Sequence, residues 1–310
     1  MNRKIIPARC SNGQQTPGYQ RWRRTLGGLL AGFLAALLVA CDSSDTDTVA
    51  STAQENVSTQ PPLTIETLQR ERHVRIYLPP SYADSDRRYP VLYMHDGQNL
   101  FDDATSFVGE WGVDETLNAL AESHGLELIV VGIDHGGDHR MTELNPFDND
   151  RFGKGQGDAY LDFVVGQLKP RVDRDYRTLP DRDNTAIMGS SMGGLISHYA
   201  IGRHPQVFSK AGIFSPAYWV GPQIFSRAEQ KLPADTRLYL LMGGREGEDM
   251  VGNFEQMGKL LARRHPTEGW RAKLVESGEH NEGFWRSELA EAILWLFDPG
   301  ESFATRPGAE

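Results

Sequence analysis

The sequence predicts a three-layer α/β domain with a mostly parallel central sheet. Segments rich in β-branched and aromatic residues alternate with segments of helical periodicity, which is typical of strand–helix–strand units. Residues 128–133 also form the uninterrupted apolar run Leu-Ile-Val-Val-Gly-Ile. Such a run is expected for a strand of a parallel sheet that helices cover on both faces.

The first half of the chain shows this alternation element by element. Segments 73–78 and 89–94 are predicted strands, separated by a turn of Pro, Ser and Asp residues. The helix predicted at 113–123 carries apolar residues at helical spacing. The helix predicted at 159–168 is expected to stop at Pro170, because proline lacks the backbone N–H that a helix interior requires.

The second half continues the same pattern and contains no internal repeat. Further strands are predicted at 127–133, 185–189, 208–214, 237–242 and 270–275, and further helices at 192–203, 251–264 and 284–297. A folded unit from 63 to 298 has about 235 residues, which suits one domain of this class.

Charge and cysteine content exclude several functional classes. The 310 residues include 42 acidic and 32 basic side chains, a net charge of −10. A nucleic-acid-binding protein is expected to carry a basic surface instead. Two cysteines are too few for a disulfide framework or a cysteine-based zinc cluster.

The charge is unevenly distributed, because residues 1–40 hold six basic residues and no acidic one. An uncharged run rich in Leu, Ala and Gly follows, and it ends in Leu-Val-Ala-Cys at 38–41. This pattern predicts a secretory signal in residues 1–40. The last four residues resemble a bacterial lipobox, which implies that Cys41 becomes a lipidated N-terminus. An uncleaved anchor, a secreted protein cut nearby and a twin-arginine signal at Arg23 and Arg24 are the alternatives.

The segment after the predicted signal is polar. Residues 42–60 are mostly Ser, Thr, Asp, Ala and Gln, and such a composition buries too little apolar surface to offset its ordering entropy. We therefore expect a disordered tether over 41–62 and a polar tail over 299–310. Cleavage before Cys41 would leave 26 basic and 42 acidic residues, a net charge of −16. The expected location is the bacterial cell envelope, with the lipid as the membrane contact.

A serine turn at 189–193 is the strongest chemical signal. The residues Gly-Ser-Ser-Met-Gly match Gly-x-Ser-x-Gly, and they stand between a predicted strand and a predicted helix. This setting is that of a nucleophile elbow, where a tight turn exposes the serine oxygen at a helix N-terminus. Ser191 is the candidate nucleophile, and a strand–helix turn without chemistry is the alternative.

A nucleophilic serine needs a base and an acid that orients the base. In this architecture the chain order is serine, acid, histidine. His280 follows the last predicted strand, so it is the candidate base. The acid should follow the strand at 237–242, where Glu246 is preferred and Asp249 and Glu248 are the alternatives.

Two backbone N–H groups should stabilise a developing oxyanion. One is expected from Met192, directly after the candidate nucleophile. The other is expected from Gln98, because Gly97 allows a tight turn after the strand at 89–94.

Several segments together resemble the putative-esterase family of α/β-hydrolases, which includes esterase D, enterochelin and feruloyl esterases and mycolyltransferases. The similar segments are the oxyanion region at 93–101, the elbow region at 176–178 and 188–194, residues 214–219, the Glu246 loop, and His280-Asn281-Glu282 with Trp285. The resemblance covers roughly residues 65 to 297. It implies an α/β-hydrolase fold and serine ester hydrolysis without a cofactor or metal.

The resemblance leaves the substrate open. A small ester, an acylated carbohydrate and a siderophore lactone are all compatible with it, and no nucleic-acid or obligate protein partner is implied. An acyltransferase with the same triad and a non-catalytic binding lipoprotein are the alternative functions. The Asp-His-Gly-Gly-Asp-His run at 134–139 is expected to be a substrate-contact loop, with a plain loop or a metal site as alternatives. Trp111, Tyr218 and Trp219 are candidates for a pocket wall or for core packing.

Overall fold

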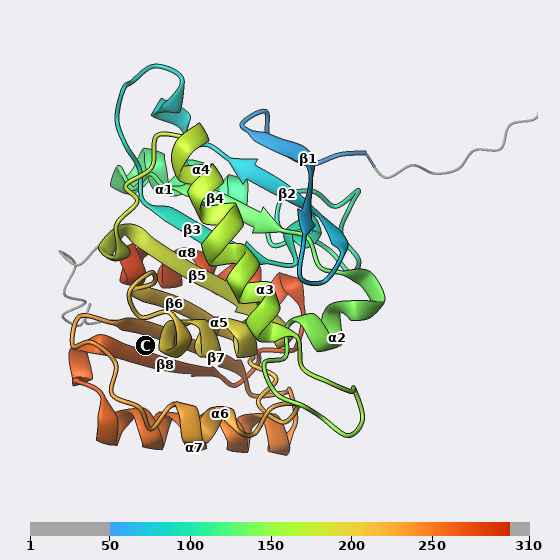
Figure 1. The fold of residues 1–310 in the computed structure, drawn as a ribbon. Helices are drawn as coiled ribbons and strands as arrows, with labels where there is room; N and C mark the ends of the chain where they lie inside the picture. The colour runs from blue at the N-terminus through green and yellow to red at the C-terminus, as the bar shows by residue number, and fades with distance from the viewer. Residues whose placement is uncertain (1–49, 298–310) are drawn as a thin grey trace, which may run out of the picture. The chain divides into compact units, whose positions relative to one another are not determined.

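The central sheet has eight strands in the order β1-β2-β4-β3-β5-β6-β7-β8 (Figure 1). The structure is a computed structural model, and it describes residues 50–297. The strands are β1 (Val57–Ile65), β2 (Arg70–Tyr77), β3 (Val91–His95), β4 (Ile129–Ile133), β5 (Thr185–Ser190), β6 (Lys210–Phe214), β7 (Arg237–Gly243) and β8 (Trp270–Val275). Strand β2 pairs antiparallel with both β1 and β4, and the six strands β4, β3, β5, β6, β7 and β8 run parallel to one another. The prediction of an α/β fold with a mostly parallel sheet is confirmed.

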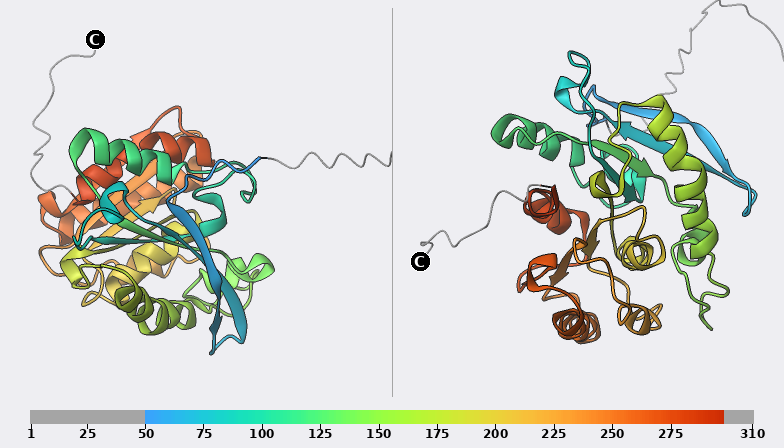
Figure 2. Two further views of the ribbon diagram at one scale, coloured as in Figure 1. Left: turned by 90° about the horizontal axis from the view of Figure 1, so that it is seen from above. Right: turned by 60° about the vertical axis from the view of Figure 1, so that its left-hand side comes forward.

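Helices cover both faces of this sheet (Figure 2). They are α1 (Val113–His124), α2 (Arg140–Glu143), α3 (Gly157–Phe163), α4 (Lys169–Asp175), α5 (Met192–Arg203), α6 (Ile224–Arg227), α7 (Glu248–Arg264) and α8 (Glu282–Phe297). Helices α1 and α8 contribute to the apolar core on one face. Helices α3 to α7 contribute to the core on the other face. The sheet is therefore the middle of three layers.

The inner parallel strands are largely apolar on both faces, as the sequence predicts, whereas the edge strand β8 carries Arg271 and Lys273. In β3, Val91 and Tyr93 belong to one core and Leu92 and Met94 to the other. All five residues of this strand are buried. Successive side chains of a strand point to opposite faces, so a strand covered on both sides must be apolar throughout.

The predicted disordered tether over 41–62 is wrong for the part that the structure describes. Strand β1 begins at Val57 and pairs with β2, and a bulge between Gln60 and Leu63 accommodates two prolines. Before it, the backbone N–H of Gln54 donates to Asp114 over 2.8 Å. Backbone pairing and side-chain hydrogen bonds hold this segment in place, although its composition is polar.

The predicted helix stop at Pro170 is also wrong. A π-helical turn over Val164–Leu168 joins α3 directly to α4, and Pro170 lies in the first turn of α4. The wider π turn changes the hydrogen-bond pairing just before Pro170, so the N–H that proline lacks does not end the helix there. The chain consequently stays helical from Gly157 to Asp175.

The remaining elements differ from the predicted ones mainly at their ends. Helix α5 has the predicted bounds, whereas α7 begins three residues earlier than predicted. The predicted signal, Cys41 and the tail over 299–310 lie outside the described residues. No helix within residues 50–297 is both long enough and apolar enough to cross a membrane.

Candidate active site

Ser191 occupies a strained turn between β5 and α5. Its backbone angles are φ 57° and ψ −117°, a conformation that non-glycine residues rarely adopt. The turn is held by the end of β6, because the Ser191 N–H donates to the carbonyl oxygen of Phe214 over 2.9 Å. A Cβ on Gly189 would lie 2.9 Å from the carbonyl carbon of Gly193. Glycine at 189 is thus required by the close approach of the two backbones, as the elbow prediction assumes.

His280 and Glu246 are hydrogen-bonded partners. Nδ1 of His280 lies 2.7 Å from Oε2 of Glu246, and the Glu246 side chain is completely buried. The imidazole is 38% exposed, so it can contact both its partner and the solvent-filled cleft. The two alternative acids, Glu248 and Asp249, are exposed in the first turn of α7. Of the three carboxylates considered, Glu246 is the one that contacts His280.

The second oxygen of Glu246 is also occupied. Oε1 accepts a hydrogen bond from Oγ of Ser215 over 2.5 Å and one from the Gly243 N–H over 2.9 Å. The Ser215 hydroxyl in turn accepts from Nε1 of Trp285 over 2.8 Å. These contacts fix the plane of the carboxylate. Sequence reasoning did not assign a role to Ser215, and its position directly after a predicted strand was the one signal that could have found it.

A cleft of about 520 Å³ lies where the parallel strands end, and both Ser191 and His280 line it. Its other lining residues come from the segments that follow β3 and β4, from the last residue of β5 and from the start of α8. They are Asp96, Asn99, Phe107, Val108, Trp111, His135, Gly137, Asp138, Arg140, Ser190, Glu282 and Trp285. Ligands of open α/β sheets bind at this edge, because loops from several strands meet there.

The two expected oxyanion donors are each the sequence neighbour of a residue that lines this cleft. Met192 is the first residue of α5, whose N-terminus carries backbone N–H groups without helical partners. Gln98 stands between the lining residues Asp96 and Asn99, and its side-chain Oε1 accepts from the His135 N–H over 3.2 Å. Both residues are thus adjacent in sequence to the cleft lining, and the roles of their N–H groups stay predictions.

An ion pair stands beside the expected oxyanion segment. Arg140 donates to both carboxylate oxygens of Asp96, over 2.6 and 2.8 Å. Burial alone would raise the pKa of Asp96, but the Arg140 guanidinium outweighs it and holds that pKa below its ordinary value. Burial lowers the pKa of the neighbouring His95 to about 4, so this imidazole is neutral at pH 7. The carboxylate of Asp96 therefore stays ionised beside the cleft.

The loop at 134–139 forms part of the cleft wall. Asp134 pairs with Arg75 over 2.9 Å, while His135, Gly137 and Asp138 line the cleft. Within residues 50–297, no group of three or more His, Cys, Asp or Glu side chains could hold a metal ion. The position of the loop fits the predicted substrate-contact role better than the metal site.

The three candidate aromatic residues have different environments. Trp111 lines the cleft but is 2% exposed, and its ring stacks on Phe214 at 5.3 Å. Tyr218 is completely buried, and its hydroxyl lies 2.7 Å from Nδ1 of His198. Trp219 is exposed but lies outside the cleft. Core packing accounts for Tyr218, and only Trp111 contributes to the site.

An eight-stranded sheet of this order, with a serine on a strained turn after β5, is the fold of the α/β-hydrolases. A serine, a histidine and a buried carboxylate at one sheet edge are the kinds of group that acyl-transfer enzymes combine in a catalytic triad. Residues 65–296 match the family described as "Putative esterase", and the chain belongs to that family. It is a carboxylic-ester hydrolase.

Three proteins resemble this chain at low sequence identity. A Bacillus subtilis (strain 168) protein named "Uncharacterized protein YbbA" is 26% identical over 251 residues, which are 74% of this chain and 94% of that protein. The iron(III) salmochelin esterase of Escherichia coli O6:H1 is 25% identical over 243 residues, and the match covers 72% of this chain but only 54% of that esterase. A solved ferulic acid esterase has the same fold, with a TM-score of 0.61, 19% identity, and coverage of 78% of this chain and 97% of that chain.

Proposed function

We propose that this esterase works through a Ser191–His280–Glu246 triad and a covalent acyl-enzyme. The supporting observation is the 2.7 Å hydrogen bond between His280 and the buried Glu246, in a cleft that Ser191 also lines. Because Nδ1 of His280 faces Glu246, Nε2 is the nitrogen available to Ser191. The hydrogen bond between a nucleophilic serine and its base often shortens only when substrate is bound.

The reaction follows the general triad scheme. Nε2 of His280 takes the proton from Oγ of Ser191 as this oxygen attacks the ester carbonyl carbon. The N–H groups of Met192 and Gln98 stabilise the oxyanion that forms. His280 then gives its proton to the leaving alcohol, which departs and leaves Ser191 acylated. A water molecule, deprotonated by His280, then attacks the acyl carbonyl carbon, and His280 returns the proton to Oγ of Ser191 as the bond between this oxygen and the acyl group breaks and the acid leaves. Glu246 stabilises the charged imidazole in both steps.

The proposed substrates are siderophore-type lactones and aromatic or acetyl esters of carbohydrates. Two relatives support this range, since one is named an iron(III) salmochelin esterase and another an endo-1,4-beta-xylanase/feruloyl esterase. Both are 25% identical to this chain, so identity does not favour one of the two. A panel of feruloyl, acetyl-xylan and enterobactin esters would rank them by kcat/KM.

The test of the mechanism is p-nitrophenyl acetate hydrolysis by the detergent-solubilised full chain. We expect Ser191→Ala to lower kcat by about 10³-fold or more. The matched control Ser123→Ala, on the exposed face of α1, should keep the parental rate. If Ser191→Ala hydrolyses the ester as fast as the parent, the assignment of the nucleophile is wrong. Product analysis with a glycosyl acceptor separates hydrolysis from acyl transfer.

We also propose that Cys41 is lipidated and holds the enzyme in the cell envelope. The support is the Leu-Val-Ala-Cys sequence at 38–41 after a basic and an apolar segment. Cys41→Ser should move the protein from the membrane fraction to the soluble fraction, or leave an unprocessed precursor. Unchanged processing and membrane recovery in Cys41→Ser would exclude lipidation at this residue.

A further inference from the structure

Two apolar side chains at the cleft are left in solvent. Within residues 50–297, the exposed large apolar side chains are Phe107, Val108, Trp219 and Leu274. Phe107 is 85% exposed and Val108 61%, and these two line the cleft with Ser191 and His280. Adjacent exposed apolar groups at a concave site mark a surface that becomes covered on binding.

The backbone at Phe107 is held by a buried amide. Oδ1 of Asn99 accepts a hydrogen bond from the Phe107 N–H over 3.2 Å. Nδ2 of Asn99 donates to Oε1 of Glu282 over 3.3 Å. Residues 100–112, between the turn at Gly97–Asn99 and α1, are called the Phe107 loop below. Glu282 stands two residues after His280, so the Asn99 side chain joins the Phe107 loop to the segment that carries the proposed base. This link connects parts of the chain that are 183 residues apart.

The other side of the Phe107 loop is held by the N-terminal segment. The Ser51 hydroxyl donates to Asp102 over 2.8 Å, and the Asp103 N–H donates to Oγ1 of Thr52 over 2.9 Å. Asp103 also accepts from the Glu110 N–H over 3.1 Å. The loop is therefore anchored around its exposed apolar tip. A side chain whose backbone is already fixed loses less entropy when a ligand covers it.

The remainder of the cleft is mostly polar. Asp96 and Arg140 form an ion pair there, and His135 and Asp138 also line the cleft. Burial raises the pKa of Glu282, and the nearby Asp96 carboxylate adds to that effect while Asn99 and His280 oppose it. An ester that fits such a cleft carries one apolar group and a polar remainder.

We propose that Phe107 and Val108 form a preorganised subsite that binds an aromatic or other bulky apolar group of the ester substrate, and that Asn99 and Glu282 position it. The proposal rests on the proposed function, because the occupant is the substrate that Ser191 attacks. The lining shared with Ser191 and His280 favours a substrate group over a separate partner protein as the occupant.

Three esters test the subsite: ethyl acetate, ethyl phenylacetate and benzyl acetate, with hydrolysis followed by pH-stat on the detergent-solubilised full chain. We expect at least one aromatic ester to have a kcat/KM about tenfold above that of ethyl acetate. Phe107→Ala should remove most of this preference, mainly by raising KM. Leu274→Ala, which removes an exposed apolar side chain outside the cleft, should keep the preference.

The same preference ratio tests the positioning residues. Glu282→Gln retains an acceptor for the Asn99 amide, so it should keep more of the preference than Glu282→Leu. Asn99→Ala should lose the preference for the aromatic ester. The double variant Asn99→Ala/Glu282→Leu should have the same kcat/KM ratio as Asn99→Ala alone, since both changes break one chain of hydrogen bonds. Additive losses in the double variant would show that the two residues act independently, and would overturn the claim that Asn99 and Glu282 position the subsite together.

The outcomes separate the subsite from the proposed mechanism. If Ser191→Ala still hydrolyses these esters, the proposed mechanism fails and the subsite falls with it. If hydrolysis needs Ser191 but the parent shows no aromatic preference, or if Phe107→Ala keeps it, the subsite alone is wrong. Thermal melting of every variant checks that a changed ratio does not come from unfolding.

Discussion

Glu246 illustrates how much of the site depends on the exact placement of a single carboxylate. Both of its oxygens are engaged, one by His280 and the other by Ser215 and the Gly243 N–H. A carboxylate held in this way selects one imidazole tautomer and stabilises the imidazolium that forms during proton transfer. The neighbouring acids lack such contacts, although in the sequence they stand only two and three residues away.

Glu246→Gln should therefore lower kcat by about 10²- to 10⁴-fold with a small change in KM, because the amide favours the wrong tautomer of His280. Steady-state kinetics with p-nitrophenyl acetate would measure the loss. Glu248→Gln and Asp249→Asn are matched controls in the adjoining first turn of α7, and both should stay within about twofold of the parent. A larger loss in Asp249→Asn than in Glu246→Gln would move the acid role to Asp249.

At the residue scale, the sequence reveals groups with a fixed local pattern but misses groups defined by distant contacts. Ser191 and His280 are recognisable because each has a set place relative to a predicted strand. Ser215 acquires its role from Glu246, 31 residues away, and Asn99 from Glu282, 183 residues away. No local sequence pattern predicts contacts between residues so far apart in the chain, so these pairs are found only in the folded structure.

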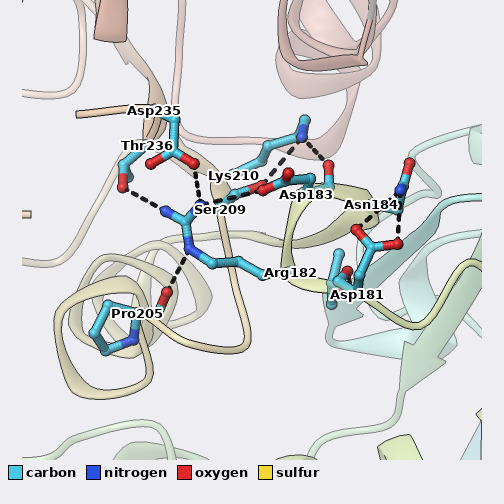
Figure 3. Close-up of polar contacts among 10 residues, drawn as sticks. Asp181, Arg182, Asp183, Asn184, Pro205, Ser209, Lys210, Asp235 and Thr236 are labelled. Atoms are coloured by element: carbon cyan, nitrogen blue, oxygen red, sulfur yellow. Dashed lines mark hydrogen bonds and ion pairs between the residues drawn. The ribbon is translucent and has the colours of Figure 1, made fainter. Parts of the chain in front are cut away.

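At the scale of elements, the amino ends of the strands are tied together by a separate polar cluster around Arg182 (Figure 3). Nε of Arg182 donates to the Pro205 carbonyl oxygen over 2.5 Å, and Nη2 donates to Oγ1 of Thr236 over 3.0 Å. The guanidinium also pairs with Asp235. One side chain thus joins the loop before β5, the end of α5 and the loop before β7, on the edge opposite the catalytic cleft.

Arg182→Met should destabilise the fold by about 1–3 kcal/mol, because it leaves the buried Thr236 hydroxyl and the half-buried Pro205 carbonyl without their donor. Thermal unfolding would show the loss, while kcat/KM should stay at the parental value since the cleft is at the other edge of the sheet. The control is Arg171→Met, which breaks an exposed ion pair with Asp175 at 3.6 Å and should cost less than about 1 kcal/mol. Equal melting of the two variants would show that the Arg182 cluster does not stabilise the fold.

The start of α1 carries a carboxylate whose burial opposes its ionisation. Asp114 is fully buried, and burial raises its pKa to about 7, with Glu115 adding to the shift and the Gln54 N–H opposing it. The folded pKa lies above the ordinary value of 3.8, so folding favours the protonated form. The stability that Asp114 contributes is complete below about pH 4 and is lost as the pH rises to about 7.

Asp114→Asn should remove this pH dependence. The variant should be about 1–2 kcal/mol more stable than the parent at pH 8, with a much smaller difference at pH 4.5. Thermal melts at the two pH values would measure it, with Glu122→Gln on the exposed face of the same helix as control. A parent whose stability rises between pH 4.5 and pH 8 more than that of the variant would contradict the expected sign.

The elements also show where periodicity is informative. Helix α5 has the predicted bounds because its apolar pattern and its flanking turn agree. The sequence predicts that the helix at 157–175 ends before Pro170, because proline usually ends a helix and a π turn cannot be recognised from the apolar pattern. Strand β1 was missed because only three positions of its nine, Val57, Leu63 and Ile65, are large and apolar, and its stability comes from pairing with β2.

On the scale of the whole molecule, these two errors have different consequences. The π turn changes one helix and leaves the predicted architecture intact. Strand β1 changes the boundary of the domain, because residues 51–54 and 57–65 contact α1, the Phe107 loop and β2. What the composition predicts to be a tether therefore includes an edge strand of the catalytic domain and part of the support of its cleft.

Two truncated chains test this boundary, one starting at Ala50 and one at Leu63. The shorter chain loses the pairs from Val57 to Gln60 with β2 and the contacts of Ser51 and Gln54 with Asp102 and Asp114. It also leaves the outer edge of β2 open to pairing with other molecules. Its melting temperature should fall by about 5 °C or more below that of the longer chain, and light scattering should detect oligomers.

The same pair of chains separates support of the fold from support of the cleft. Removal of Ser51 and Thr52 frees one side of the Phe107 loop, so the chain starting at Leu63 should raise KM for the preferred aromatic ester even at temperatures where it is folded. Both chains lack Cys41, so membrane anchoring does not enter the comparison. Equal melting temperatures and equal KM values would mean that residues 50–62 are a tether after all.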